Sequence, residues 1–421
     1  MSTEKLLEMI DCAPSSQQFA RGSTGMQEAV DHPGRPTLKP ALTWHIITCE
    51  YPPQSGGVSD YAHLVAGALA AAHDEVHVWC PGYAGKIPQT PGVNVHSVMG
   101  KFTLRDLRNA GRLLSAFPKP RRLLVQWVPH GYGYKALNLP FCLWLLYRSA
   151  RYGDYIDLMV HEPFLDFTKR SWRQSVAAFV QRLMTVILLR AAGHVWVSTP
   201  TWTKRLRPYS LLHRHTFDWL PVISNVPVLD DPAAVAALRD HYVPDWILIG
   251  HFSTFGPSIT PMLRAILPRL LASASQASVL LIGGGGADFR TSFISEHPNL
   301  AQRVHATGRL DARDLSFHIS ACDILIQPYP DGVTSRRTTV MAALSHGRPV
   351  VTTSGPLTET FWKSSNALVL AGVEDADTFV SSVLGLLDNP TKRADIAECA
   401  RELYLSQFAI ECIVGRLRRG A

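Results

Sequence analysis

The sequence has no pair of cysteines at the Cys-x-x-Cys spacing, and its seven cysteines are scattered, most of them in apolar stretches. A disulfide framework or a zinc site would require cysteines at short, regular spacings. We therefore expect reduced, buried thiols and a cytoplasmic protein. The N-terminus also lacks the apolar core of a secretory signal.

A long apolar run is missing as well. The most lipid-like segment covers residues 137–147, ends at Arg148, and is well short of the ~20 residues that a membrane span needs. We expect it to form a buried helix in a soluble protein, which still leaves room for contact with a membrane surface.

The dinucleotide-binding spacing Gly-x-Gly-x-x-Gly is absent too. In "LIGGGGADF", Asp288 or Phe289 stands where the third glycine belongs, and the segment does not follow the first strand. A hydride-transfer enzyme is therefore weakly supported.

The 421 residues suffice for about two to three domains, and 46% apolar against 18% charged residues indicates a folded chain. The net charge of +7 predicts a surface that attracts anions. Nucleic acid, acidic lipid headgroups and phosphorylated small molecules all qualify, and charge alone does not choose among them.

The order of segments predicts an α/β fold. Residues 1–40 are rich in Ser, Gly and Pro and are expected to be a flexible leader. Apolar runs then alternate with amphipathic helices, which indicates parallel sheets covered on both faces. The pattern breaks near residues 224–235, the expected linker, and then restarts. We expect domains at 41–228 and 229–400, with a final helix over 394–419 whose end, 401–421, crosses back to the first domain.

Two strand–loop–helix junctions are candidate phosphate sites. In the first, Gly56 and Gly57 permit close backbone approach and Ser59 is a candidate cap, so bare N–H groups would face an anion. A tight turn with glycine for packing explains the same residues. In the second, Gly332 follows a strand, Thr334 or Ser335 is a candidate cap, and Gly347 ends the helix.

Arg336 and Arg337 fall in the expected first turn of that second helix, where the helix dipole disfavours positive charge. A bound phosphate would explain them, because guanidinium forks suit such an anion. The alternative is a structural network in which Asp331 or Glu359 neutralises both arginines.

Seven segments, in this order, resemble bacterial glycosyltransferases of the GT-B fold, the family 4-like group. They are "EYPPQSGGVSDY" at 50–61, "VHEPF" at 160–164, "VSTP" at 197–200, "LPVISNVP" at 220–227, "IGHFSTFG" at 249–256, "ATGRL" at 306–310 and "PYPDGVTSRRTTVMAALSHGRPVVTT" at 328–353. The resemblance covers residue 43 to the C-terminus. It implies two Rossmann-like domains facing a deep cleft, and transfer of a sugar, expected to be a hexose, from a nucleoside diphosphate donor to a hydroxyl group.

The resemblance also implies roles for particular residues. His161 would contact the transferred sugar, and Glu162 would accept the acceptor's proton; a satisfied histidine and an arginine-paired carboxylate are the structural alternatives. The donor would meet the second domain, with the glycine loop closing from the first. The implied donor-binding residues are Gly56, Gly57, Val58, Ser253, Thr254, Gly256, Gly308, Arg309, Gly332, Thr334, Ser335, Arg336, Arg337 and Thr338.

One departure from the family concerns two glutamates eight positions apart. Their places fall on Thr334 and Ala342, which leaves Asp331 as the nearest stand-in. A degenerate protein that binds nucleotide or a partner without catalysis is therefore the alternative to an active enzyme. The one Asp-x-Asp pair, Asp375 and Asp377, is expected at an ordinary helix start, so we predict no cofactor and no obligatory metal.

The expected acceptor is a cell-envelope glycan or lipid-linked saccharide, and the resemblance leans toward retention at the anomeric carbon. Basic stretches at 167–174 and 201–215 also contain Trp and Tyr, and are either a contact with the inner face of the plasma membrane or a solvated face. No nucleic-acid module is recognisable, and we expect no such partner.

Overall fold

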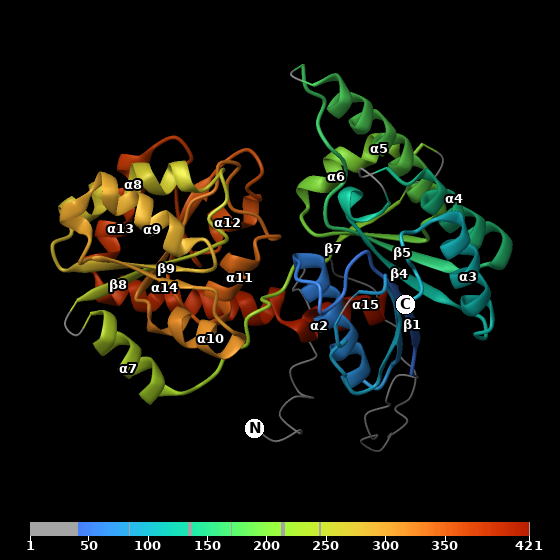
Figure 1. Ribbon diagram of the computed structural model, residues 1–421, viewed down its shortest axis with the longest axis horizontal. Helices are drawn as coiled ribbons and strands as arrows, with labels where there is room; N and C mark the ends of the chain where they lie inside the picture. Colours follow the sequence, from blue (N-terminus) through green and yellow to red (C-terminus); the bar gives the residue numbers. More distant parts are fainter. Residues whose placement is uncertain are drawn as a thin grey trace, which may run out of the picture.

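The computed structural model describes residues 41–420 except 84, 134–136, 170, 212–214 and 244–245. The leader expected over residues 1–40 lies outside the described residues. The described chain forms two parallel β-sheets with helices on both faces of each (Figure 1). The predicted α/β class with two doubly wound domains is confirmed.

The first sheet has seven strands in the order β3-β2-β1-β4-β5-β6-β7. The strands are β1 Thr43–Ile47, β2 Glu75–Trp79, β3 Val93–His96, β4 Arg122–Trp127, β5 Tyr155–Val160, β6 His194–Val197 and β7 Phe217–Trp219. The intervening helices are α2 Gly57–Ala71, α3 Leu104–Ser115, α4 Leu139–Tyr147, α5 Trp172–Ala191 and α6 Thr201–Leu206. Strands β1, β4 and β5 are almost wholly buried because helices cover both faces.

The second sheet has six strands in the order β10-β9-β8-β11-β12-β13. They are β8 Ile247–Phe252, β9 Ala277–Ile282, β10 Val304–Gly308, β11 Ile324–Gln327, β12 Val350–Ser354 and β13 Val369–Gly372. Its helices are α7 Pro232–Tyr242, α8 Thr260–Ser273, α9 Gly286–Glu296, α10 Ala312–Ala321, α11 Thr338–Ser345, α12 Thr360–Ser364 and α13 Ala376–Leu387. Helix α7 begins inside the stretch expected to be a linker, because Asp231 caps it by accepting from the Ala234 amide.

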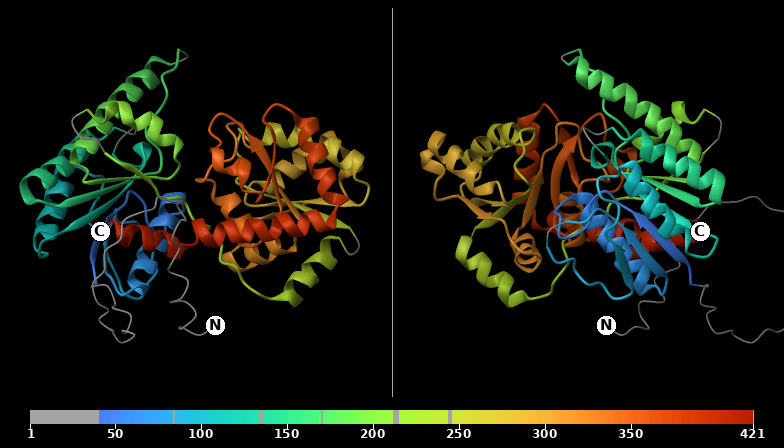
Figure 2. Two further views of the ribbon diagram at one scale, coloured as in Figure 1. Left: turned by 180° about the vertical axis from the view of Figure 1, so that it is seen from behind. Right: turned by 45° about the vertical axis from the view of Figure 1, so that its right-hand side comes forward.

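The predicted single helix over 394–419 is wrong. The chain forms α14 Pro390–Leu403, a π-helical turn Tyr404–Phe408 and α15 Ile410–Arg419, with Ala409 in an extended conformation between them. Helix α15 lies against α2 of the first domain, and the left view of Figure 2 shows α14 and α15 running from the second domain across to the first. An ion pair of 3.4 Å between Arg418 and Asp74 fixes its end.

The apolar segment that starts at residue 137 forms α4, and its burial is only partial. Phe141, Cys142 and Leu145 are buried, whereas Leu143 and Tyr147 are exposed. No helix in the described part of the chain combines the length and apolarity needed to span a bilayer.

Candidate functional site

The two arginines lie just before α11 and not in its first turn, so that prediction is wrong. Arg337 is the N-cap residue, and no side chain caps the helix. Thr334 and Ser335 therefore do not cap it, although the Arg337 amide donates to the Thr334 carbonyl in a preceding turn. Gly347 follows the helix with a positive φ of 58°, as expected of a terminating glycine.

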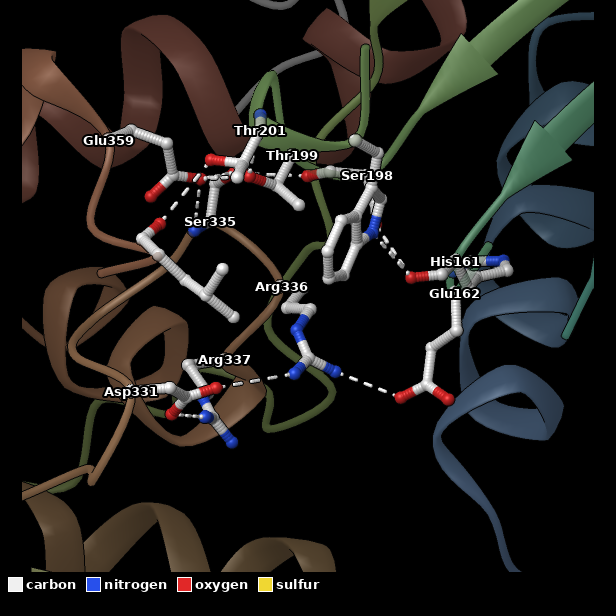
Figure 3. A network of polar contacts seen from close by, with 12 residues as sticks. His161, Glu162, Ser198, Thr199, Thr201, Asp331, Ser335, Arg336, Arg337 and Glu359 are labelled. Carbon is white, nitrogen blue, oxygen red and sulfur yellow. Dashed lines mark hydrogen bonds and ion pairs between the residues drawn. The ribbon is translucent and has the colours of Figure 1, made fainter. Parts of the chain in front are cut away.

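Both guanidinium groups lie at the interface between the domains, where Figure 3 shows them beside two carboxylates. Arg336 lies 2.9 Å from Glu162 of the first domain and 3.6 Å from Asp331, measured between nitrogen and oxygen. Arg337 also pairs with Asp331. Of the two acids considered as partners in the sequence, Asp331 takes this role and Glu359 does not.

These ion pairs do not engage every N–H group of the two guanidinium groups. The Nε atoms of Arg336 and Arg337 are buried and have no hydrogen-bond partner in the described part of the chain, and the same holds for Oγ1 of Thr334. Burial, and then the neighbouring Arg337, lower the pKa of Arg336. The site therefore has buried donors available for a further anion.

Glu359 holds the arginine loop against the first domain. Its Oε1 accepts from the Thr199 hydroxyl at 2.7 Å and from the Ser335 amide at 2.9 Å, and its Oε2 accepts from Trp362 Nε1 at 2.9 Å. The Ser335 hydroxyl lies 2.6 Å from Oε1 and 3.0 Å from the Ser198 carbonyl oxygen. This buried carboxylate, visible in Figure 3, fixes the position from which Arg336 extends.

His161 follows β5 and is buried beside the same interface. Its Nε2 lies 2.8 Å from Gln126 Oε1, and its carbonyl oxygen accepts from the Ser198 hydroxyl and from Trp202 Nε1. Burial lowers the pKa of His161 to about 3, so the imidazole is neutral near pH 7. Sequence reasoning missed Gln126, which lies within a buried strand and has no local motif.

Glu162 is exposed enough to reach both solvent and the arginine loop. Besides Arg336, it has His130 Nδ1 at 3.6 Å from its Oε2. Glu162 is therefore paired with an arginine, as the structural alternative expects. The proton-accepting role of Glu162 stays a prediction.

The glycine loop differs from the expected anion cradle. Helix α2 begins at Gly57, and Glu50 Oε1 accepts from the amides of Val58 and Ser59 at 3.0 Å each. Two N–H groups expected to be bare are thus paired with a carboxylate of the protein itself. Ser59 does not cap the helix, because its hydroxyl donates to the Gln54 carbonyl at 2.6 Å. A Cβ on Gly56 would lie 2.3 Å from Glu50 Oε1, so any other residue there would displace the Glu50 carboxylate.

The other predicted donor residues lie at the carboxyl ends of strands in the second sheet. Ser253 follows β8, and its Oγ lies 2.8 Å from His251 Nε2 and accepts from the Phe255 amide. Thr254 is exposed, and the Gly256 carbonyl accepts from the first residues leading into α8. Such an edge is where doubly wound sheets bind ligands.

Two further loops reach this same edge. Gly308 ends β10 with a φ of 70°, and exposed Arg309 follows it. Gly332, after β11, has a φ of 84°, and a Cβ there would lie 2.3 Å from the Gly355 amide nitrogen. Thr338 is the first residue of α11.

The positions of the two missing glutamates differ in their surroundings. Ala342 is fully buried in an apolar cluster, so a carboxylate there would lack solvent, whereas Thr334 is buried beside the arginines. Asp375 caps α13 by accepting from the Thr378 amide at 2.8 Å, and Asp377 lies in the first turn, as expected of an ordinary helix start.

Comparison with known families matches residues 244–389 to the family model "Glycosyl transferases group 1". The matched residues lie in the second domain, and the chain as a whole has the GT-B fold. The prediction of a GT-B glycosyltransferase is confirmed at this level. A search of curated protein sequences finds no significant match.

Solved GT-B structures resemble nearly the whole chain. Sucrose-phosphate synthase from Thermosynechococcus elongatus has a TM-score of 0.70 at 17% identity, over 90% of this chain and 98% of that one. HepE from Anabaena, solved with UDP and glucose, has a TM-score of 0.64 at 14% identity, over 90% and 99%. WaaG, a glycosyltransferase involved in lipopolysaccharide biosynthesis, has a TM-score of 0.57 at 15% identity, over 89% and 98%. At these identities the likeness establishes the fold.

Proposed function

We propose that this glycosyltransferase moves a hexose from a nucleoside diphosphate sugar to a hydroxyl group of a cell-envelope glycan or lipid-linked saccharide, in the cytoplasm and with retention at the anomeric carbon. The donor would bind the carboxyl edge of the second sheet, and the acceptor would enter from the first domain. Contact with the inner face of the plasma membrane is part of the same proposal.

The observation that carries this proposal is that Arg336 and Arg337 each keep a buried Nε without a hydrogen-bond partner in the described part of the chain. A diphosphate supplies several acceptor oxygens and at least two negative charges, which matches the two buried Nε–H donors of Arg336 and Arg337. Donor binding would exchange the carboxylates of Glu162 and Asp331 for phosphate oxygens. Thr334 Oγ1 lies in the same loop and offers one more hydrogen bond.

The chemistry follows from where charge develops. As the sugar–phosphate bond breaks, negative charge grows on the leaving diphosphate, and fixed guanidinium donors stabilise it without an obligatory metal. Glu162, released from Arg336, would be free to accept the proton of the acceptor hydroxyl. Neutral His161, whose Nε2–H donates to Gln126 Oε1, would accept a hydrogen bond from a sugar hydroxyl at Nδ1.

A donor screen followed by a transfer assay tests the proposal. Thermal shift across nucleoside diphosphate sugars, with UDP-glucose as the first member, identifies the donor by the stability that a bound ligand adds. Release of nucleoside diphosphate from that donor is then measured with cell-envelope extract as the acceptor. Absence of transfer and hydrolysis with every donor would contradict the proposal.

A further inference from the structure

Four large apolar side chains are exposed along one face of α5. Trp172, Val176, Phe179 and Leu183 are 73%, 50%, 64% and 43% exposed. Their spacings of four, three and four residues place them in a single stripe on the helix. Scattered apolar side chains are normal on a protein surface, whereas a continuous row marks an interaction site.

The stripe leads into an apolar groove at the C-terminal part of α5. This groove has a volume of about 170 Å³ and is lined in part by Val186 and Ile187 of α5, Leu146 of α4, and Tyr209. Apolar surface therefore follows most of the length of the helix.

The segment that carries the stripe is rich in positive charge, and the acid just before it, Asp166, pairs with Arg205. Residues 167–217 contain nine Lys and Arg residues and no Asp or Glu. The Arg173 guanidinium lies 5.8 Å from the centre of the Trp172 ring, and Arg190 is exposed seven residues beyond Leu183, two turns along the same face. Aromatic and aliphatic side chains beside cations are typical of helices that lie in the interface of an anionic bilayer.

The position of α5 fits such a contact. Its N-terminal end projects beyond the other elements of the first domain in Figures 1 and 2. Trp172 follows Glu162, which lies at the domain interface, by ten positions. The stripe and the residue expected to accept the acceptor's proton therefore lie in the same domain, joined by one short stretch of chain.

We propose that α5 is a membrane-docking helix, whose stripe of Trp172, Val176, Phe179 and Leu183 inserts into the headgroup region of an anionic bilayer. Docking would bring the domain interface to acceptors held in that bilayer, and this consequence rests on the proposed function. A second copy of the chain is a poorer occupant, because a two-fold interface would bring two segments rich in Lys and Arg together.

Vesicle co-sedimentation of the full chain tests the docking. We expect retention by vesicles of phosphatidylcholine mixed with phosphatidylglycerol and little by phosphatidylcholine alone. The double variant Trp172→Ser, Phe179→Ser should bind the anionic vesicles about tenfold or more weakly, because it removes the most exposed apolar area. Trp246→Ser is the matched control, since that tryptophan is 39% exposed on the second domain.

Charge reversal supplies a second, independent test. Lys169→Glu with Arg173→Glu should weaken binding to anionic vesicles severalfold, whereas Lys392→Glu on α14 should not. Equal retention of wild type and Trp172→Ser, Phe179→Ser would overturn the proposal. A wild-type dimer that this variant converts to a monomer would also overturn it, because the stripe would then be a protein interface.

Nucleoside diphosphate binding by the same proteins separates docking from catalysis. We expect unchanged affinity in the α5 variants, because none of the substituted residues lies at the arginine site. If the wild-type protein binds vesicles but transfers no sugar, the proposed function is contradicted and the proposal that α5 docks on a membrane is supported.

Discussion

Arg336 of the second domain and Glu162 of the first form an ion pair of 2.9 Å across the domain interface. Carboxylate and phosphate oxygens accept hydrogen bonds from the same guanidinium N–H groups, so a donor diphosphate would compete with Glu162 for Arg336. The measured donor affinity would then include the cost of displacing a carboxylate. Donor binding and release of Glu162 for proton transfer would become one event.

Replacing Glu162 by glutamine tests this coupling. We expect Glu162→Gln to bind nucleoside diphosphate severalfold more tightly, because the charge that competes for Arg336 is gone. Turnover should fall about 10²–10⁴-fold, the contribution of a general base. Calorimetry and steady-state kinetics measure the two effects, with Glu296→Gln, a surface partner of Arg264, as control. Unchanged turnover would refute the proton-accepting role.

We expect that replacing Glu359 by a side chain of equal size already destabilises the protein. In the described part of the chain, the Glu359 carboxylate accepts from Thr199, Ser335 and Trp362. Glutamine has a single acceptor oxygen and must turn its NH₂ toward one of these donors. We expect Glu359→Gln to lower the free energy of unfolding by about 1–3 kcal/mol, the cost of leaving a buried donor unsatisfied.

Urea denaturation of Glu359→Gln beside the exposed control Glu374→Gln measures this loss. The variant should also bind nucleoside diphosphate more weakly, since the loop that carries Arg336 would lose its anchor. Wild-type stability in both proteins would show that Glu359 does not hold the interface.

Three buried histidines predict a stability that depends on pH. Burial lowers the pKa of His45 and of His161 to about 3 and that of His251 to about 4. The unfolded chain takes up their protons near the ordinary value of 6.5, while the folded chain stays neutral. The stabilising contribution is therefore complete above about pH 6.5 and is lost as the pH falls, by about 1.4 kcal/mol per unit for each histidine.

Urea midpoints at about pH 7.5 and about pH 5.5 check this expectation. His45→Gln should be less acid-sensitive than wild type, because one of the three groups no longer titrates. Equal midpoints at the two pH values would contradict the assignment of neutral histidines.

The fold was largely predictable because its central strands are apolar runs between amphipathic helices. The edge strands β3 and β7 were not, since they are short and only partly buried, so no apolar run marks them. The break at Ala409 also has no signal, because alanine favours helix. At Ala409 the chain passes from the second domain to the first, and this path requires an extended residue where alanine alone would favour helix.

The site was predictable where a local motif exists. His161, Glu162, Asp331, Arg336 and Arg337 lie in short segments, and the structure brings them to one interface. Glu359 as an anchor and Gln126 beside His161 were not foreseen, because their partners are distant in sequence; Thr199 and Glu359 are 160 positions apart.

The pairing of Glu50 with the start of α2 was missed for a different reason. Its partners, Val58 and Ser59, are near in sequence, and the signal was a carboxylate a few residues before a helix start. The glycine pattern beside it predicts an anion site from the same residues, so the sequence alone does not distinguish the two.

Calorimetric titration of UDP into wild type and into the double variant Arg336→Ala, Arg337→Ala examines the anion site most directly. Charged hydrogen bonds contribute about 1.5–3 kcal/mol each, so the affinity should fall by well over tenfold. Arg313→Ala, which removes an exposed arginine of the second domain, should bind like wild type. Equal affinity in the double variant and wild type would show that these arginines hold carboxylates of the protein and no donor diphosphate.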